Sequence, residues 1–465
     1  MSKIYELEHL HQPDGWLSPG FVTVDANGMI EAVDAELQTG WEVDAKLSGF
    51  CIPGLPNLHS HAFQRALAGR TECISDDGND TFWTWRSFMY DFVSRLGPEE
   101  YAALGAFVYL EMVKFGMTSV AEFHYVHHDP KGRRYNNHGE MSERLISAAN
   151  DVGIAITMFP VLYAHAGIGM PATEQQRRFI HTRVDDYLDL VNTLNQRCSN
   201  RYMQSTGIAL HSLRAVAPDE IRDAVAGALE VNPDCRIHIH VSEQPREVEE
   251  VVAGLGARPV QWLLDNVELN QQWSLIHATH IDAQERAGMA KSGAVAGLCP
   301  VTEATLGDGI FPLVEYQQEG GSWGIGTDSH YTTSTAEELR ILECGLRLQA
   351  GRRNMLASNE KETTRRTGRR LFDLVLAGGA QSFGMPVGSI NAGKRADLVV
   401  LEADHPALIS HGTETVLDAW TLSSTVNPVR DVMIAGNWIV RDGKHEMEEA
   451  ILQNYKKAMR GLLDS

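Results

Sequence analysis

The sequence predicts an α/β protein: a (β/α)8 barrel of the TIM type with a small β-sandwich built from both ends of the chain. Three observations predict this architecture. Residues 52–385 alternate short apolar runs of β type with longer amphipathic helical runs. Both ends of the chain are instead rich in short strands and turns. Polar residues, histidines among them, follow several apolar runs at the point where each run gives way to a loop.

Eight apolar runs in the middle of the chain have the length and composition of buried strands. They are residues 51–58, 118–123, 154–162, 207–211, 235–241, 273–277, 294–299 and 323–327. Amphipathic helices are predicted between several of them, at residues 98–115, 175–194, 218–229 and 282–291. Strands that alternate with crossover helices are typical of a barrel whose functional residues lie at the C-terminal ends of the strands.

The two ends of the chain supply the second predicted unit. Near the start, FVTVDANGMIEAVDA alternates around an Ala-Asn-Gly turn, which indicates a hairpin, and strand-like runs return in ADLVVLEA and VRDVMIAGNWIVRDGKH. We therefore expect residues 1–51 and 386–445 to form the β-sandwich and residues 52–385 to form the barrel. Residues 446–465 are expected to form a C-terminal helix.

The composition limits the partners and the location of the protein. With 465 residues, 43% of them hydrophobic, the chain can fill a substantial core. A net charge of -21 and a pI near 5.3 argue against binding to nucleic acid or to an acidic membrane surface. The six cysteines show no CxxC spacing, and the N-terminus MSKIYELEHL lacks the apolar stretch of a signal peptide. We expect reduced thiols and a cytoplasmic protein.

The candidate site begins with His59 and His61, in the stretch PGLPNLHSHAFQ. Residues i and i+2 of an extended segment point to the same face, so both imidazoles can reach one ion. A lone His-x-His pair is about as often structural as it is chelating. Three more residues at predicted strand ends favour chelation, namely His240, His277 and Asp328. Imidazoles and a carboxylate suit a divalent ion such as Zn²⁺, or Fe²⁺, with one position left for water, which indicates a hydrolase.

Other histidines near these positions have a simpler explanation. His238 shares a strand face with His240 but lies deeper, so we expect a hydrogen-bonded core residue. His330 follows Asp328 closely and is a minor candidate for the site.

The order of these residues resembles the amidohydrolase superfamily. In that superfamily a His-x-His pair follows strand one, histidines follow strands five and six, and an aspartate follows strand eight. The step from His240 to Glu243, which reads HVSE, resembles the motif of the deaminase branch, in which the glutamate carries protons to the leaving nitrogen. The resemblance covers nearly the whole chain.

Within that branch, several stretches are similar to the deiminases that hydrolyse N-formimino-L-glutamate to N-formyl-L-glutamate and ammonia in histidine degradation. These stretches are PNLHSHAFQRALAG, FWTWR, AEFHYVHHD, HSLRAV, HATH and LGDGIFP. The resemblance implies one metal ion held by His59, His61, His240 and Asp328. It implies catalytic roles for Glu243, His277 and Asp328. It also implies substrate contacts from Gln64, Arg86, Tyr125, His211 and Arg214.

Several alternatives stay open. Binuclear members of the superfamily place a lysine after strand four, where this sequence has GIALHSLRAV, so one ion is expected. Arg86 could instead be a surface arginine stacked on tryptophan, and Tyr125 a packed core residue. The protein could also deaminate an aminated ring such as guanine or a triazine, or serve as a scaffold without activity. The resemblance further implies a homodimer that acts on a small dicarboxylate amidine.

Overall fold

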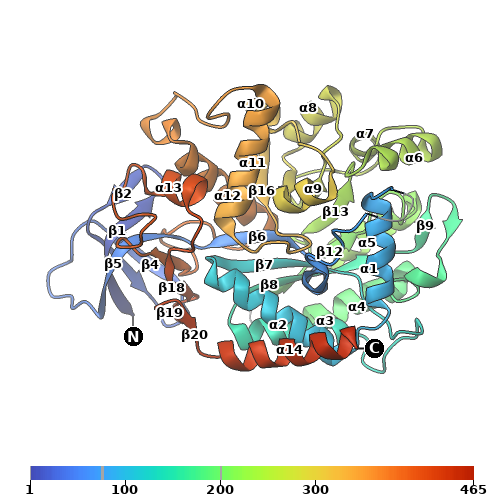
Figure 1. The fold of residues 1–465 in the computed structure, drawn as a ribbon, viewed down its shortest axis with the longest axis horizontal. Coiled ribbons are helices and arrows are strands. Elements are labelled where there is room, and N and C mark those ends of the chain that lie inside the picture. The colour runs from blue at the N-terminus through green and yellow to red at the C-terminus, as the bar shows by residue number, and fades with distance from the viewer. Residues whose placement is uncertain (1, 75–77, 199–201, 465) are drawn as a thin grey trace.

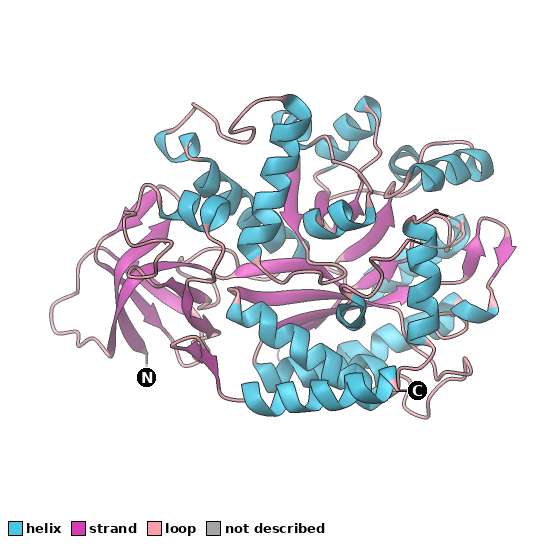
Figure 2. Ribbon diagram, in the orientation of Figure 1, coloured by secondary structure: helices cyan, strands magenta, loops and turns pink. Residues whose placement is uncertain are grey.

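The computed structural model describes residues 2–74, 78–198 and 202–464. It has two parts, which Figure 1 shows as a smaller sheet on the left and a larger body of strands and helices beside it. In Figure 2 the helices of the larger part lie around the outside of its strands. The predicted fold class is confirmed, because a nearly closed parallel barrel forms this larger part.

Eight parallel strands form the barrel, and each predicted run overlaps one of them. They are β6 (Leu55–Ser60), β7 (Met117–His124), β8 (Ala155–Leu162), β12 (Ile208–Leu210), β13 (Ile237–Val241), β14 (Trp273–His277), β15 (Val295–Leu298) and β16 (Ser322–Ile325). They are hydrogen-bonded in this order, and the short strand β11 (Gln204–Thr206) pairs with β8. A parallel bridge between Ser60 and Asp328 brings the first strand to the end of the last one.

The first predicted strand is shared between two sheets. Residues 51–53 belong to β5 (Ala45–Pro53) of the small sheet, whereas β6 of the barrel begins at Leu55. Gly54 makes the crossing, and a Cβ atom at this position would lie 2.2 Å from the side chain of Thr118. Only glycine therefore lets the chain pass from one sheet to the other this close to β7.

Most predicted helices lie between the barrel strands. The helices of this part are α1 (Phe82–Val93), α2 (Pro98–Lys114), α3 (Glu140–Val152), α4 (Val184–Arg197), α5 (Pro218–Val231), α6 (Pro245–Leu255), α7 (Pro259–Asn266), α8 (Ala283–Ser292), α9 (Pro300–Leu306), α10 (Leu313–Gln318), α11 (Thr335–Ala350) and α12 (Thr367–Phe383). Proline opens several of them, at the position where a missing N–H costs nothing. Within the described part of the chain, no helix is both long and apolar enough to cross a membrane.

The predicted helix at residues 175–194 is wrong in its first half. Only the short turn η2 (Glu174–Gln176) and then α4, from Val184 onward, are helical. The intervening segment is held in a loop because the backbone N–H groups of His127 and His128 donate to the carbonyl of Arg178, each at 3.0 Å. The buried Arg178 side chain in turn donates from Nε to the carbonyl of His128 at 2.9 Å. These contacts between distant segments outweigh the local helical pattern.

Strands from both ends of the chain form the small sheet. They are β1 (Lys3–Gln12), β2 (Gly15–Leu17), β3 (Gly20–Val24), β4 (Ile30–Asp34), β5, β17 (Leu398–Leu401), β18 (Val429–Ile434), β19 (Asn437–Arg441) and β20 (Lys444–His445). The predicted hairpin is β3 with β4, which pair antiparallel. The two chain ends meet where β17 pairs with β5. Helix α13 (Val416–Ser423) packs on α11 and α12, and α14 (Glu448–Leu463) runs along α2, at the bottom of Figure 1.

A buried arginine joins the small sheet to the barrel. Arg395, which is 1% exposed, donates from Nε and Nη2 to the two carboxylate oxygens of Asp397 at 2.9 and 2.6 Å. Its Nη2 also donates to Ser119 Oγ on β7 at 2.6 Å. The small sheet and the barrel are therefore joined by the contact between Arg395 and Ser119, and the buried charge of this arginine is balanced by Asp397.

Replacing Arg395 with alanine is expected to lower the free energy of unfolding by about 3–5 kcal/mol, because the buried carboxylate of Asp397 would lose its partner. Urea titration measures this loss. Arg183→Ala is the control, because that arginine pairs with Asp185 at the surface and should contribute about 0–1 kcal/mol. A loss below about 1 kcal/mol in the Arg395 variant would contradict the role of the pair.

Candidate active site

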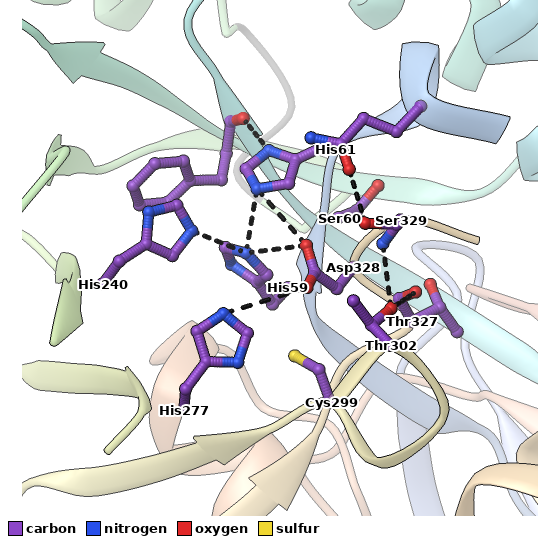
Figure 3. A network of polar contacts seen from close by, with 12 residues as sticks. His59, Ser60, His61, His240, His277, Cys299, Thr302, Thr327, Asp328 and Ser329 are labelled. Atoms are coloured by element: carbon purple, nitrogen blue, oxygen red, sulfur yellow. Dashed lines mark hydrogen bonds and ion pairs between the residues drawn. The ribbon is translucent and has the colours of Figure 1, made fainter. Parts of the chain in front are cut away.

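Five side chains from far-apart strand ends meet at one mouth of the barrel. His59 lies in β6 and His61 follows it, His240 lies in β13, His277 ends β14, and Asp328 follows β16. The Nε2 atom of His59 is 3.2 Å from Nε2 of His61 and 3.1 Å from Nε2 of His240. Oδ1 of Asp328 lies 3.5 Å and 3.4 Å from the Nε2 atoms of His59 and His61, as Figure 3 shows.

Hydrogen bonds to backbone carbonyls fix which nitrogen of two of these rings carries the proton. Nδ1 of His61 donates to the carbonyl of Phe123 at 2.8 Å, and Nδ1 of His240 donates to that of His211 at 3.1 Å. A neutral imidazole has a single N–H, so each Nε2 presents a lone pair to the centre of the cluster. Burial lowers the pKa of His59, His61 and His240, which keeps them neutral.

This donor set fits a divalent metal ion. Lone pairs and a carboxylate that face one another repel unless a cation lies between them. A tetrahedral ion with bonds of about 2.0–2.2 Å holds its ligand atoms about 3.3–3.6 Å apart, close to the separations between Asp328 and the imidazoles of His59 and His61. His59, His61, His240 and Asp328 could therefore hold the ion, and His277 lies close enough to His59 and Asp328 to form a second possible group of ligands.

His277 and Glu243 stand beside this cluster in a different environment. Nε2 of His277 lies 3.5 Å from Glu243 Oε1 and 3.8 Å from Asp328 Oδ2, and its Nδ1 lies 3.2 Å from Glu303 Oε1. Burial disfavours a charged His277, but the surrounding carboxylates outweigh it and raise its pKa well above the usual value. Burial raises the pKa of Glu243 to about 7, with Asp328 adding to the shift and His277 opposing it. Glu243 can therefore exchange a proton near neutral pH.

The backbone is strained at this mouth of the barrel. Ser242, His277, Ala278, Asp328 and His330 all have positive φ angles, between 47° and 67°. Residues other than glycine adopt such angles at a cost, and they persist where surrounding contacts fix them. The loop after β13 is one such place, because the carboxylate of Glu247 accepts the backbone N–H groups of Ser242 and Glu243 at 3.2 and 3.1 Å.

All five predicted substrate residues line one cavity next to the cluster. They are Gln64, Arg86, Tyr125, His211 and Arg214, and the same cavity is lined by His61, His240, Glu243, His277 and Asp328. The side-chain amide of Gln64 donates to the Tyr125 hydroxyl at 2.8 Å and accepts from Ser329 Oγ at 2.5 Å. His59, behind these residues, does not line the cavity.

Arg86 and Arg214 bring positive charge to this cavity. Arg86 also stacks on an aromatic ring, with its guanidinium carbon 4.5 Å from the ring centre of Trp83, so it contacts tryptophan and lines the cavity at the same time. Arg214 is buried and lies 3.9 Å from Glu247 Oε2, while its Nε has no hydrogen-bond partner among the described residues. The cavity therefore offers unused guanidinium donors.

Four buried carboxylates that support the site are absent from the sequence-based prediction. Glu122 accepts from Ser60 Oγ and from the backbone N–H of Ala62, Glu303 contacts His277, and Glu247 holds the loop of Glu243. Asp308 accepts a hydrogen bond from Gln244, and burial, with Glu243 adding to it, raises its pKa to about 9. Glu122 carried a usable signal, because it is the one charged residue in the strand MTSVAEFH.

Other histidines lie outside the cluster. His238, expected in the core, is hydrogen-bonded to Ser382 Oγ at 3.1 Å. His330 lies 3.0 Å from Ser60 Oγ and 2.9 Å from Thr327 Oγ1, behind the strand ends that carry the cluster.

A barrel with such a cluster of imidazoles and carboxylates at its C-terminal mouth belongs to the class of metal-binding barrel hydrolases. The chain is a member of the amidohydrolase family, whose profile matches residues 50–439.

Known relatives extend this finding. The chain is 46% identical to formimidoylglutamate deiminase of Pseudomonas aeruginosa, over 100% of both chains. Among solved structures it is similar to an amidohydrolase from Brucella melitensis, with a TM-score of 0.91, 39% identity, and coverage of 99% of this chain and 100% of that one. An adenosine deaminase from Xanthomonas campestris with bound zinc shares the fold, with a TM-score of 0.80, 21% identity, and coverage of 99% and 98%.

Proposed function

We propose that the protein hydrolyses N-formimino-L-glutamate to N-formyl-L-glutamate and ammonia, a reaction of histidine degradation. The observation that carries this proposal is the pairing of two arginines, Arg86 and Arg214, with the histidine and carboxylate cluster in one cavity. A guanidinium group binds a carboxylate through two parallel hydrogen bonds, and this substrate carries two carboxylates. The full-length similarity to formimidoylglutamate deiminase of Pseudomonas aeruginosa supports the same substrate.

One divalent ion, Zn²⁺ in our proposal and Fe²⁺ as the alternative, would be held by His59, His61, His240 and Asp328. When bound, such an ion lowers the pKa of water to about 7 and so supplies hydroxide at neutral pH. The region after the fourth barrel strand has His211 and Arg214 in place of a lysine that could bridge two ions. A single ion is therefore the proposal.

The protein side chains would bind the substrate and transfer protons in separate groups. Tyr125, His211 and Arg214 would hold one carboxylate of the substrate, with Gln64 and Arg86 near its remaining polar groups. This grip would place the formimino carbon beside the cluster.

Proton transfer would fall to three residues beside the reacting carbon. Asp328 would take a proton from the attacking water, and His277 would orient that water. Glu243 would deliver protons to the nitrogen that leaves as ammonia. The substrate amidine is basic and binds protonated, so its carbon is already electrophilic.

A ring deaminase is the second candidate, and one observation favours it. Phe82, Trp85, Tyr90 and Tyr163 line the same cavity and could enclose a flat ring. A neutral ring would leave Arg86 and Arg214 without a carboxylate to bind, however, and unpaired buried charge is costly. The dicarboxylate amidine would bind to the arginines and react at the cluster. A scaffold without activity would need neither the arginines nor the cluster.

The proposal predicts that the purified protein releases ammonia from N-formimino-L-glutamate and contains about one metal ion per chain. Ammonia release and metal content should be measured on the same sample, with guanine, adenosine and an aminated triazine as competing substrates. Ammonia from a ring but none from N-formimino-L-glutamate would replace the proposal with the ring deaminase. Metal-free protein that keeps its fold and acts on no substrate would favour a scaffold.

We also propose that the protein works in the cytoplasm as a homodimer and binds neither nucleic acid nor membranes. The net charge of -21 supports the last point, because both of these partners are themselves negative. A mass near twice 51.4 kDa by light scattering would support the dimer.

A further inference from the structure

Three arginines gather around one indole ring at the edge of the cavity. The guanidinium carbons of Arg86, Arg214 and Arg246 lie 4.5, 5.5 and 4.4 Å from the ring centre of Trp83. They come from three separate segments, since Arg86 lies on α1 with Trp83, Arg214 follows β12, and Arg246 begins α6. Trp83 itself is half-buried and is not among the residues that line the cavity.

The three arginines differ in how closely a carboxylate is paired with each of them. Arg246 is paired with Glu250 at 2.8 Å, and Arg214 has only the longer contact to Glu247 at 3.9 Å. Arg86 forms no ion pair with any residue that the structure describes. The two arginines that line the cavity are thus the two with unused charge, and a bound carboxylate would supply what is missing.

An indole ring can hold these arginines without using their hydrogen bonds. A guanidinium group that lies over an aromatic ring is attracted through its flat face, which leaves its N–H donors free at the edge. Arg86 also lies over Tyr90, at 5.6 Å from the ring centre, so two rings lie close to its guanidinium group. Attraction of each guanidinium group to the ring of Trp83 also offsets part of the mutual repulsion of the three cations.

We propose that Trp83 is a positioning residue that sets the preference for dicarboxylate substrates, because its ring fixes the planes of Arg86 and Arg214. This inference rests on the proposed function and extends it, since it names the side chain that orients the carboxylate-binding arginines. The alternative is a purely structural role, in which Trp83 attaches α1 to α6 through Arg246 alone.

Trp83→Leu removes the ring, and Trp83→Phe keeps a smaller aromatic face. Trp438→Leu is the matched control, because the guanidinium carbon of Arg441 lies 4.6 Å from that ring in the small sheet. For N-formimino-L-glutamate we expect the leucine variant to raise KM about 5- to 30-fold with kcat changed less than about threefold. The phenylalanine variant should recover part of the loss, and the control should match the wild type.

Two substrate analogues show which carboxylate of the substrate depends on the ring of Trp83. N-formiminoglycine lacks the side-chain carboxylate, and N-formimino-4-aminobutyrate lacks the α-carboxylate. Loss of the Trp83 ring should raise KM less for an analogue that lacks a carboxylate bound by Arg86 or Arg214 than for N-formimino-L-glutamate. An equal effect on all three substrates, or a fall in kcat at constant KM, would overturn the inference.

Calorimetric binding of N-formyl-L-glutamate and of glutarate separates this inference from the proposed function. If the wild type releases no ammonia yet binds glutarate more tightly than the Trp83→Leu variant does, the proposed function fails and the role of Trp83 stands. Equal binding by both proteins would overturn the role of Trp83, whatever the activity. Should the leucine variant unfold, the comparison is made with Trp83→Phe, for which unchanged binding and KM would count against the inference.

Discussion

Glu243→Gln is expected to lower ammonia release about 10²- to 10⁴-fold while the protein keeps its metal. Glutamine has the shape of glutamate but cannot carry a proton to the leaving nitrogen, and transfer by a positioned side chain contributes about this factor. Glu243 is not among the four residues proposed to hold the ion, so metal content should stay at the wild-type level. Steady-state kinetics and metal analysis of one preparation measure both quantities.

The stability of this variant gives a second readout. Burial raises the pKa of Glu243 to about 7, which means that the folded protein holds the charged form at a cost. Glutamine removes that cost, so the thermal midpoint should be equal to or above that of the wild type. Glu249→Gln, an exposed change on helix α6, which follows Glu243, should leave activity intact. Normal turnover by the Glu243 variant would exclude it as the proton carrier.

His59→Ala is expected to remove most of the metal and with it nearly all activity. His59 is fully buried, and its Nε2 lies within 3.2 Å of the corresponding atoms of His61 and His240. Changes to residues that merely support metal ligands cost about 10- to 100-fold in affinity, and loss of a ligand should exceed this. Metal analysis after dialysis measures the change.

Thermal unfolding with and without a chelator tests the same variant independently of activity. An ion at about 1,000 times its dissociation constant stabilises the folded state by about 4 kcal/mol. A chelator should therefore lower the midpoint of the wild type but leave that of His59→Ala unchanged. His165→Ala serves as control, because that histidine pairs with Glu220 away from the cluster. Full metal content in the His59 variant would show that the ion is held elsewhere.

The helix predicted at residues 175–194 shows where the local sequence pattern fails to predict the secondary structure. Its first half has a helical distribution of polar and apolar residues, but hydrogen bonds from His127 and His128 hold the carbonyl of Arg178 in a loop. The strand predicted at residues 51–58 shows a second limit, because an apolar run does not reveal that Gly54 divides it between two sheets. Both differences arise from contacts between segments that are distant in the sequence.

The buried carboxylates that support the site were not predicted, because their contacts also join segments that the local pattern does not relate. Glu247 and Glu303 lie in the first turns of α6 and α9, where acidic residues are common because they favour the positive end of the helix. Nothing in that pattern indicates that one holds the loop of Glu243 and the other contacts His277. Asp308, in the loop after α9, lies in the stretch LGDGIFP that resembles the deiminases, but its sequence pattern does not indicate its contact with Gln244.

The sequence by itself determined the barrel and its eight strands, because the alternation of apolar and amphipathic runs follows from which faces each segment must bury. It also singled out the histidines and carboxylates at the strand ends, because parallel strands place all their C-terminal ends at one mouth. Only the tertiary structure decided which nitrogen of each imidazole faces the centre of the cluster and which buried carboxylates support the active site. It also decided that three arginines lie around the one ring of Trp83. Those features depend on distances and burial between remote residues, and a one-dimensional pattern does not contain them.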